Sequence, residues 1–353
     1  MKDDPTMGGP AASSQPVPEQ PIHGGDLSGL RGAYGGAWID LSTGINPFAW
    51  PLPALPPESW TRLPGVDDMA GLLRAARQAY GAPAGAGIVA VPGTQAAIQM
   101  LPRLFVRPQG APVRIGILGP TYAEHAHVWR SMGHQVVDID GVPGSLRDLD
   151  ILLVVNPNNP DGRGLGLPLL RRWQAELNAR GGWLILDEAF ADVVPDVSLC
   201  GDAGQSGLVI LRSFGKFFGL AGLRLGFVLG PEIVAEAIRT AAGPWAVSGP
   251  ALAIGTAALL DTGWQERMRA DLQLRARRFD LLMRDRGIHV LGGTALFRLA
   301  KIENAVRFAT ALQQQGIHVR VFGFNPNWIR FGLPADEAEF WRRFDLVLKD
   351  LSP

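Results

Sequence analysis

Four short apolar segments of the sequence are each followed by polar or glycine residues of the kinds that take part in catalysis. The residues that follow these segments are Gly93 and Thr94, Asn159, Asp187, and Ser213 with Lys216. Because open α/β sheets bind their ligands beyond the carboxyl ends of the strands, we expect these residues to meet in one crevice. A lysine amine, a carboxylate and several hydrogen-bond donors would then face the same ligand.

This set of residues suits chemistry that uses pyridoxal phosphate (PLP). The Lys216 amine could form an imine with the cofactor aldehyde. The Asp187 carboxylate could keep the pyridine nitrogen protonated, because a nearby anion stabilises its charged form, and the protonated ring draws electrons from the substrate. Gly93 and Thr94 open a predicted helix, whose free N–H groups and dipole favour a bound phosphate.

The elements that position these residues alternate along the chain from about Val89. Apolar segments predict strands at residues 87–91, 113–118, 151–155, 183–186, 208–211 and 225–229. Amphipathic periodicity predicts helices at residues 94–105, 122–132 and 168–179. This alternation is typical of an α/β protein with a mainly parallel sheet, which we expect to have seven strands.

The pattern changes after Pro250, where a long helical stretch to about Arg286 is followed by short strands and a helix. This second pattern indicates a smaller α+β domain. We therefore expect a flexible tail at 1–20, an N-terminal segment at 21–57 that contributes to the small domain and the active site, a large PLP-binding domain at 58–262, and a small domain at 263–353.

Four motifs, in this order, resemble those of the class I/II aminotransferases, which are PLP enzymes of fold type I. They are Asn156-Pro-Asn-Asn-Pro-Asp-Gly162, Asp187-Glu-Ala-Phe190, Ser213-Phe-Gly-Lys216 and Gly222-Leu-Arg-Leu-Gly226. The resemblance runs from about His23 to Phe331. It implies the fold-type I architecture, PLP as the cofactor, and a homodimer with its active sites at the subunit interface.

The resemblance implies a role for each matched residue. Lys216 matches the lysine that holds PLP as a Schiff base, Asp187 the partner of the pyridine nitrogen, and Tyr122 the aromatic residue stacked on the ring; these three form the predicted catalytic set. Asn159 matches the asparagine beside the ring hydroxyl and the substrate, and Arg330 the arginine that clamps the substrate α-carboxylate. The residues expected to bind the cofactor phosphate are Ser213, Arg224, Gly93 and Thr94.

Three positions depart from the family pattern. Phe190 stands where many relatives have a tyrosine that reaches the ring hydroxyl, and Leu63 where a tyrosine reaches the cofactor phosphate of the neighbouring subunit. Gly215 stands where a hydroxyl residue is common. We therefore expect fewer side-chain contacts to the cofactor than in many relatives.

Several stretches resemble one branch of the family, the threonine-phosphate decarboxylases of cobalamin biosynthesis. They are His23-Gly-Gly-Asp26, Ile39-Asp-Leu-Ser-Thr-Gly-Ile-Asn-Pro47, Val91-Pro-Gly-Thr-Gln95 and Gly119-Pro-Thr-Tyr-Ala-Glu-His125. Enzymes of this branch convert L-threonine O-3-phosphate to (R)-1-aminopropan-2-yl phosphate and carbon dioxide. We expect the substrate phosphate to be bound by His23, Gly24, Gly25 and Arg320.

Two other functions use much the same sequence features. Histidinol-phosphate aminotransferases share the fold, the motifs and a phosphorylated substrate. Transamination and decarboxylation differ in which bond at the substrate Cα is aligned for cleavage, and motifs that bind PLP do not report that alignment. A PLP-binding regulator would carry a DNA-binding module in front, for which we expect the first twenty residues to be too short.

The composition of the whole chain argues against several partners. Thirty-three basic residues balance thirty-three acidic ones, so no excess positive charge favours nucleic acid. We see neither a membrane-spanning apolar run nor a signal peptide, and the one cysteine, Cys200, fits a reducing compartment.

His125 and His127 stand two apart on a predicted helix and make a poor metal pair, so we take both as structural and expect no metal site. We expect a cytoplasmic enzyme for a small phosphorylated amino acid.

Overall fold

A computed structural model of the chain describes residues 24–30, 32, 34–107 and 110–351. The tail expected at residues 1–20 and the candidate ligand His23 lie outside the described residues.

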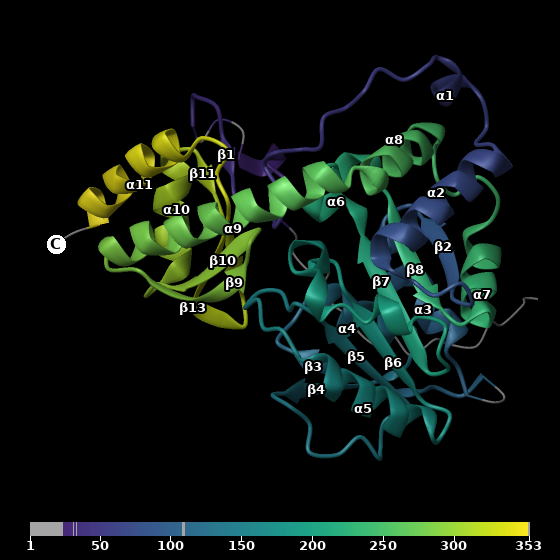
Figure 1. Cartoon of the computed structure of the whole chain (residues 1–353). Coiled ribbons are helices and arrows are strands. Elements are labelled where there is room, and N and C mark those ends of the chain that lie inside the picture. The colour runs from purple at the N-terminus through teal and green to yellow at the C-terminus, as the bar shows by residue number, and fades with distance from the viewer. Residues whose placement is uncertain (1–23, 31, 33, 108–109, 352–353) are drawn as a thin grey trace, which may run out of the picture.

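The large domain is built on a seven-stranded sheet with the strand order β2-β8-β7-β6-β5-β3-β4 (Figure 1). The strands are β2 (Gly87–Val91), β3 (Arg114–Gly119), β4 (Gln135–Asp140), β5 (Ile151–Val155), β6 (Trp183–Asp187), β7 (Leu208–Ser213) and β8 (Gly226–Gly230). Only β8 runs in the direction opposite to that of the other strands of this sheet. The predicted mainly parallel seven-stranded sheet is therefore confirmed.

Helices cover both faces of this sheet because its strands are apolar on both sides. Successive side chains of a strand point to opposite faces, and Leu152 and Leu153 accordingly belong to two different apolar clusters. One cluster includes residues of α3 (Thr94–Leu104), α4 (Ala123–Ser131) and α7 (Glu232–Ala242). The other includes residues of α2 (Val66–Tyr80), α5 (Leu167–Asn178) and α8 (Gly249–Leu260).

Short elements fill the remainder of the large domain. They are the helices α1 (Glu58–Thr61) and α6 (Phe214–Phe217) and the 3₁₀ turns η3 (Ala191–Val193), η4 (Pro195–Val197), η5 (Cys200–Asp202) and η6 (Ala221–Leu223). The long helical stretch expected after Pro250 is two helices, α8 and α9 (Thr262–Asp285). Asp261 separates them, and its carboxylate caps α9 by accepting a 3.0 Å hydrogen bond from the Trp264 N–H.

The small domain packs α9, α10 (Ala305–Gln314) and α11 (Glu337–Leu351) with a four-stranded antiparallel sheet (Figure 1). In spatial order its strands are β12 (Arg320–Phe322), β13 (Asn325–Gly332), β10 (Phe297–Lys301) and β9 (His289–Thr294). Its core is aromatic, with the Phe279 ring 5.7 Å from that of Phe340 and 6.0 Å from that of Phe331.

The N-terminal segment runs over both parts of the molecule (Figure 1). After the 3₁₀ turn η1 (Ser28–Leu30), its strand β1 (Ile39–Asp40) pairs in parallel with β11 (Ile317–His318) of the small domain. Further along, the Asn46 N–H donates to the Lys216 carbonyl and the Trp50 N–H to the Phe218 carbonyl, both at 2.9 Å. The segment therefore reaches the loop that carries Lys216.

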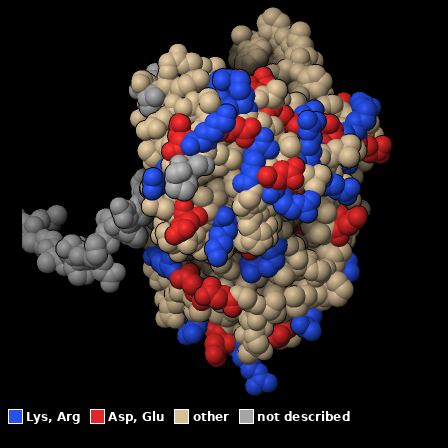
Figure 2. All heavy atoms as spheres, turned by 90° about the vertical axis from the view of Figure 1, so that its left-hand side faces the viewer, with Lys and Arg blue, Asp and Glu red and all other residues tan. Residues whose placement is uncertain are grey.

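Within the described ranges, no helix combines the length and apolarity that crossing a bilayer requires. On the face shown in Figure 2, acidic and basic side chains are interspersed.

Candidate active site

Lys216 lies on the short helix α6, directly after β7, with its side chain half-buried. Its Nζ lies 5.8 Å from the Phe190 ring centroid, and no hydrogen bond or ion pair joins the amine to another residue of the described ranges. Burial, and next the positive charge of Arg330, lower the pKa of Lys216 to about 8. A larger fraction of the amine is therefore neutral and nucleophilic near neutral pH than in an exposed lysine.

The lowered pKa of Lys216 predicts a pH-dependent stability of the cofactor-free protein. The folded pKa of about 8 lies below the usual 10.5, so between these values the unfolded chain binds more protons, and stability rises with pH. Lys216→Met removes the buried charge, so this variant should exceed the wild type in stability at about pH 7, by a margin that shrinks towards about pH 10. Urea unfolding of both proteins measures the margin, and one that stays constant or widens contradicts the prediction.

Asp187 is held at the end of β6 by two hydrogen bonds. Its Oδ2 lies 2.9 Å from Nε2 of His125, and its Oδ1 accepts the Ala189 N–H at 3.0 Å. The side chains of Asp187 and His125 are only 5% and 1% exposed. The expectation that His125 has only a structural role is therefore incomplete, because this residue fixes the carboxylate that would face the pyridine nitrogen.

Tyr122 caps α4 and places its ring beside that of His125, with centroids 5.8 Å apart in an edge-to-face arrangement. Burial, helped by the charges of Glu124 and Asp187, raises the pKa of Tyr122 to about 12. The phenol is therefore neutral at physiological pH. Tyr122 and His125 stand three apart, so the first turn of α4 brings both towards the carboxyl end of the sheet.

The residues expected to bind the cofactor phosphate lie together where β2, β8 and β7 meet. Gly226 pairs with Val91 on one side and with Ser213 on the other. Gly93 has a φ of +78°, and a Cβ there would lie 2.6 Å from Nη2 of Arg224. The positive φ favours glycine here, whereas the end of the flexible Arg224 side chain could move aside.

The backbone N–H groups of Gly93 and Thr94 are not equally available to a bound phosphate. The Gly93 N–H already donates to the Val91 carbonyl at 2.7 Å. Thr94 begins α3, and the first N–H groups of a helix have no intrahelical acceptor. A phosphate would therefore bind the first turn of α3 from Thr94 onward, together with the Arg224 guanidinium.

Arg330 of the small domain contacts both the loop that carries Asn159 and the N-terminal segment at Ser42. One of its Nη atoms donates to Oδ1 of Asn159, and the other donates to the Ser42 carbonyl at 2.7 Å. Its Nε is buried and has no hydrogen-bond partner among the described residues, and no carboxylate of those residues lies within ion-pair distance. Burial, and next the charge of Arg320, lower the pKa of Arg330 to about 9. A buried cation of this kind would gain strongly from a bound carboxylate.

The other expected substrate ligands lie close to Arg330. Arg320 is opposite Arg330 in the register of β12 and β13. Gly24 and Gly25 lie against Ser42: the Gly25 N–H donates to the Ser42 hydroxyl at 2.7 Å, and a Cβ at Gly24 would lie 2.5 Å from the Ser42 carbonyl oxygen. The Gly25 amide is therefore already engaged, and Arg320 carries the positive charge of this group.

Several known proteins are similar to this chain. Residues 68–340 match the model of the family described as aminotransferase class I and II. The chain belongs to this family. A threonine-phosphate decarboxylase of Pseudomonas aeruginosa is 45% identical over 331 residues, covering 92% of this chain and 96% of the relative. Another, from a Sinorhizobium species, is 41% identical and covers 93% of this chain and 98% of the relative.

The solved structures support the same architecture. The histidinol-phosphate aminotransferase from Sinorhizobium meliloti in complex with pyridoxal-5'-phosphate has a TM-score of 0.77 and 20% identity to this chain, covering 97% of this chain and 100% of that structure. The likeness confirms the predicted fold-type I architecture of an aminotransferase-family enzyme.

The structure gives reasons for two of the departures from the common aminotransferase pattern. A Cβ at Gly215 would lie 2.7 Å from the Ala221 Cα, so the hydroxyl residue common in the family does not fit there. The Phe190 ring packs edge-to-face on Phe297 at 5.0 Å, an apolar contact that a tyrosine hydroxyl would not improve. Leu63, the third departure, is 66% exposed.

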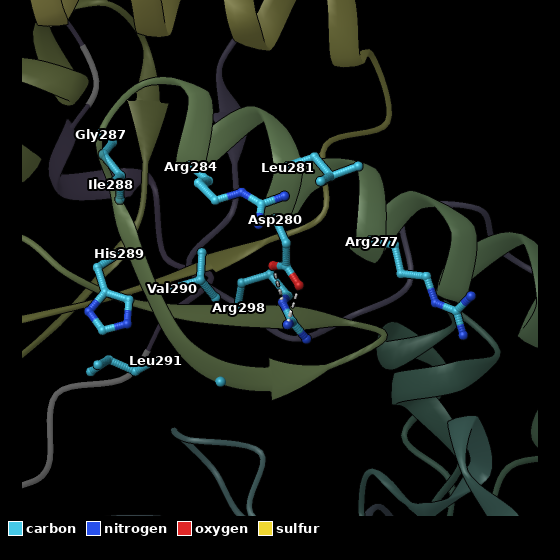
Figure 3. A pocket seen from close by; sticks show the side chains of 11 residues that line it. Arg277, Asp280, Leu281, Arg284, Gly287, Ile288, His289, Val290, Leu291 and Arg298 are labelled. Carbon is cyan, nitrogen blue, oxygen red and sulfur yellow. Dashed lines mark hydrogen bonds and ion pairs between the residues drawn. The ribbon is translucent and has the colours of Figure 1, made fainter.

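Two hollows of the surface lie away from these side chains. One, of about 800 Å³, runs between α9 and β9 and is lined by Arg277, Arg284 and His289 among others (Figure 3). The charged groups in Figure 3 do not converge on one point, and Arg298 is paired with Asp280. A smaller hollow of about 330 Å³ lies behind the loop that carries Asn159. The candidate active site is thus identified by its side chains and not by the size of a hollow.

Proposed function

We propose that this chain is a PLP-dependent threonine-phosphate decarboxylase of cobalamin biosynthesis. It would convert L-threonine O-3-phosphate to (R)-1-aminopropan-2-yl phosphate and carbon dioxide. The observation that carries the proposal is the 45% and 41% identity, over more than nine tenths of the chain, to two proteins of that name. A histidinol-phosphate aminotransferase of Leuconostoc mesenteroides is 28% identical and covers 70% of the chain.

The residues of the site fit PLP. Lys216 offers a partly neutral amine, Asp187 a fixed carboxylate, and Asn159 an amide beside Arg330. Thr94, Ser213 and Arg224 lie at one corner for the phosphate. When bound, PLP supplies a protonated ring that takes up electrons from the substrate Cα.

The chain's own residues would select the bond that breaks. Arg330 would bind the substrate carboxylate, with its guanidinium held in one orientation by Asn159 and the Ser42 carbonyl. Holding the carboxylate in a fixed direction sets which bond at Cα is aligned for cleavage. After carbon dioxide leaves, the protonated Lys216 amine or a water would deliver a proton to Cα.

The substrate phosphate would bind beside Arg320 and the N-terminal glycines. Burial is the main cause that lowers the pKa of Arg330 and that of His318, and the positive charge of Arg320 lowers both further. His23 and Gly24 would complete this subsite, whereas Gly25, whose N–H donates to the Ser42 hydroxyl, would only help to shape it. A phosphate near two guanidinium groups would relieve their mutual repulsion.

We also propose a cytoplasmic homodimer. Large apolar side chains are exposed along one stretch of the N-terminal segment and the start of α2: Leu52, Trp60, Leu63 and Val66. A concentration of exposed apolar residues of this kind is typical of a protein–protein interface.

A product assay tests the proposed reaction. The wild-type protein, reconstituted with PLP and given L-threonine O-3-phosphate without 2-oxoglutarate, should release carbon dioxide and (R)-1-aminopropan-2-yl phosphate in equal amounts. Absence of carbon dioxide, together with glutamate formation from histidinol phosphate and 2-oxoglutarate, would instead assign the chain to the aminotransferases.

A further inference from the structure

A chain of hydrogen bonds links the predicted ring-stacking residue to a buried acid. The Tyr122 hydroxyl lies 3.2 Å from Oε1 of Gln95, and Nε2 of Gln95 donates to Oε2 of Glu124 at 2.7 Å. Glu124 is only 6% exposed. Neither Gln95 nor Glu124 has been given a role in the proposed reaction above.

The chemistry of the three groups fixes the direction of this chain. An ionised carboxylate only accepts hydrogen bonds, so the Gln95 amide must turn its NH₂ towards Glu124. The amide oxygen then faces Tyr122, and the tyrosine hydroxyl must donate to it. Glu124 stands in the first turn of α4, where the helix dipole favours its negative charge.

The link joins two turns that would bind different parts of PLP. Gln95 belongs to the first turn of α3, which begins with Thr94 at the expected phosphate corner. Tyr122 caps α4, whose first turn also carries His125, the partner of Asp187. The Glu124 carboxylate accepts from the Gln95 NH₂ group and so sets which end of the amide faces the tyrosine.

We propose that Glu124 is a positioning residue for the cofactor site: acting through Gln95, it orients the Tyr122 hydroxyl and ties the ring-stacking turn to the phosphate-binding turn. The inference rests on the proposed function in that PLP is the ligand. It does not depend on whether the reaction is decarboxylation or transamination.

A double-mutant cycle on PLP affinity tests the link. Dissociation constants are measured by titrating cofactor-free wild type, Tyr122→Phe, Glu124→Ala and the double variant with PLP. Each single variant should bind PLP about fivefold to tenfold more weakly, and the double variant should be within about twofold of the weaker single one. Losses that multiply in the double variant, or a Glu124→Ala affinity equal to that of the wild type, would overturn the proposal.

Two further variants separate positioning from general stability. Glu124→Gln keeps an acceptor for Gln95 but can also donate, so it should recover only part of the affinity that Glu124→Ala loses. Gln95→Glu sets a second carboxylate against Glu124, so its loss of PLP affinity relative to wild type should be larger at about pH 8 than at about pH 5.5. A pH-independent loss in Gln95→Glu contradicts the link even if Glu124→Ala fails to fold.

Gln99→Ala provides the matched control, because Gln99 lies one turn further along α3 and is exposed. It should bind PLP within about twofold of wild type. A wild type that fails to bind PLP would refute the proposed function itself, whereas additive losses in a PLP-binding protein refute only the link.

Discussion

Lys216→Ala protein, treated with PLP and borohydride, is expected to show no trapped adduct at position 216 and to lose at least about 10,000-fold in decarboxylation rate. Both losses are expected because the imine to PLP cannot form without the Lys216 amine. Among the residues that the structure describes, Lys216 is the only lysine at the candidate site, and its pKa of about 8 means that part of its amine is neutral and nucleophilic. In the proposed reaction the same side chain would also protonate the substrate Cα, so both roles would be lost together.

The comparison variants make this prediction specific. Lys216→Arg keeps a positive charge but cannot form the imine, so its activity should be as low as that of Lys216→Ala. Lys301 and Lys349 are exposed, and replacing either with alanine should leave both the adduct and the rate near those of wild type. Peptide mapping of the borohydride-treated wild type should locate the adduct at Lys216. An adduct at another lysine, or a visible absorption band of bound PLP that persists in Lys216→Ala, would refute the assignment.

Much of the site was predictable because it lies at strand ends. Apolar segments identify buried parallel strands, and the carboxyl ends of such strands meet at one edge of the sheet. Asp187 and Ser213, the last residues of β6 and β7, are placed there by the register of the sheet alone. Asn159 and Lys216 follow from the loops that leave the same edge.

The pairings within the site were not predictable from the sequence. His125 lies 62 positions from Asp187, and Asn159 lies 171 positions from Arg330. Such pairs depend on how a helix turn or a second domain packs against the sheet, which apolar periodicity does not report. The resemblance to a family placed Asn159 and Arg330 in one site but did not predict the hydrogen bond between them.

Among the strands that escaped prediction, β4 and β9 have weak patterns. β4 is an edge strand that mixes apolar residues with Gln135, Asp138 and Asp140. β9 contains Gly292 and Gly293, which lower its strand propensity. These glycines are nevertheless required, because a Cβ at Gly292 would lie 2.4 Å from the Asp161 carbonyl oxygen, where the small domain meets the loop that carries Asn159.

Charged residues next to Asp187 and Ser213 in the sequence are buried, although charged side chains usually lie at the surface. Glu188 follows Asp187 and Arg212 precedes Ser213, yet both are buried, with side chains 0% and 3% exposed. Arg212 donates to Glu188 at 3.0 Å and to Asp192, and its guanidinium lies 4.5 Å from the Tyr80 ring centroid. This buried ion cluster ties the ends of β6 and β7 together beneath the site.

Arg212→Ala is therefore expected to destabilise the protein by about 3–5 kcal/mol, because it leaves two buried carboxylates without their cation. A loss of this size is a large part of the roughly 5–15 kcal/mol that stabilises a typical folded protein. Urea unfolding of the PLP-free protein measures it. Adding Glu188→Gln to Arg212→Ala should recover part of the loss, since one of the two uncompensated charges is then removed.

The surface pair Arg130–Asp138 is the matched control for this prediction. Both of its side chains are exposed, at 42% and 68%, although its 2.5 Å separation is shorter than the 3.0 Å between Arg212 and Glu188. Water and salt screen such a pair, so Arg130→Ala should change the free energy of unfolding by less than about 1 kcal/mol. If Arg212→Ala costs no more than Arg130→Ala, the buried cluster does not support the strand ends. Asp187 and Lys216 would then be positioned by the sheet and its apolar packing alone.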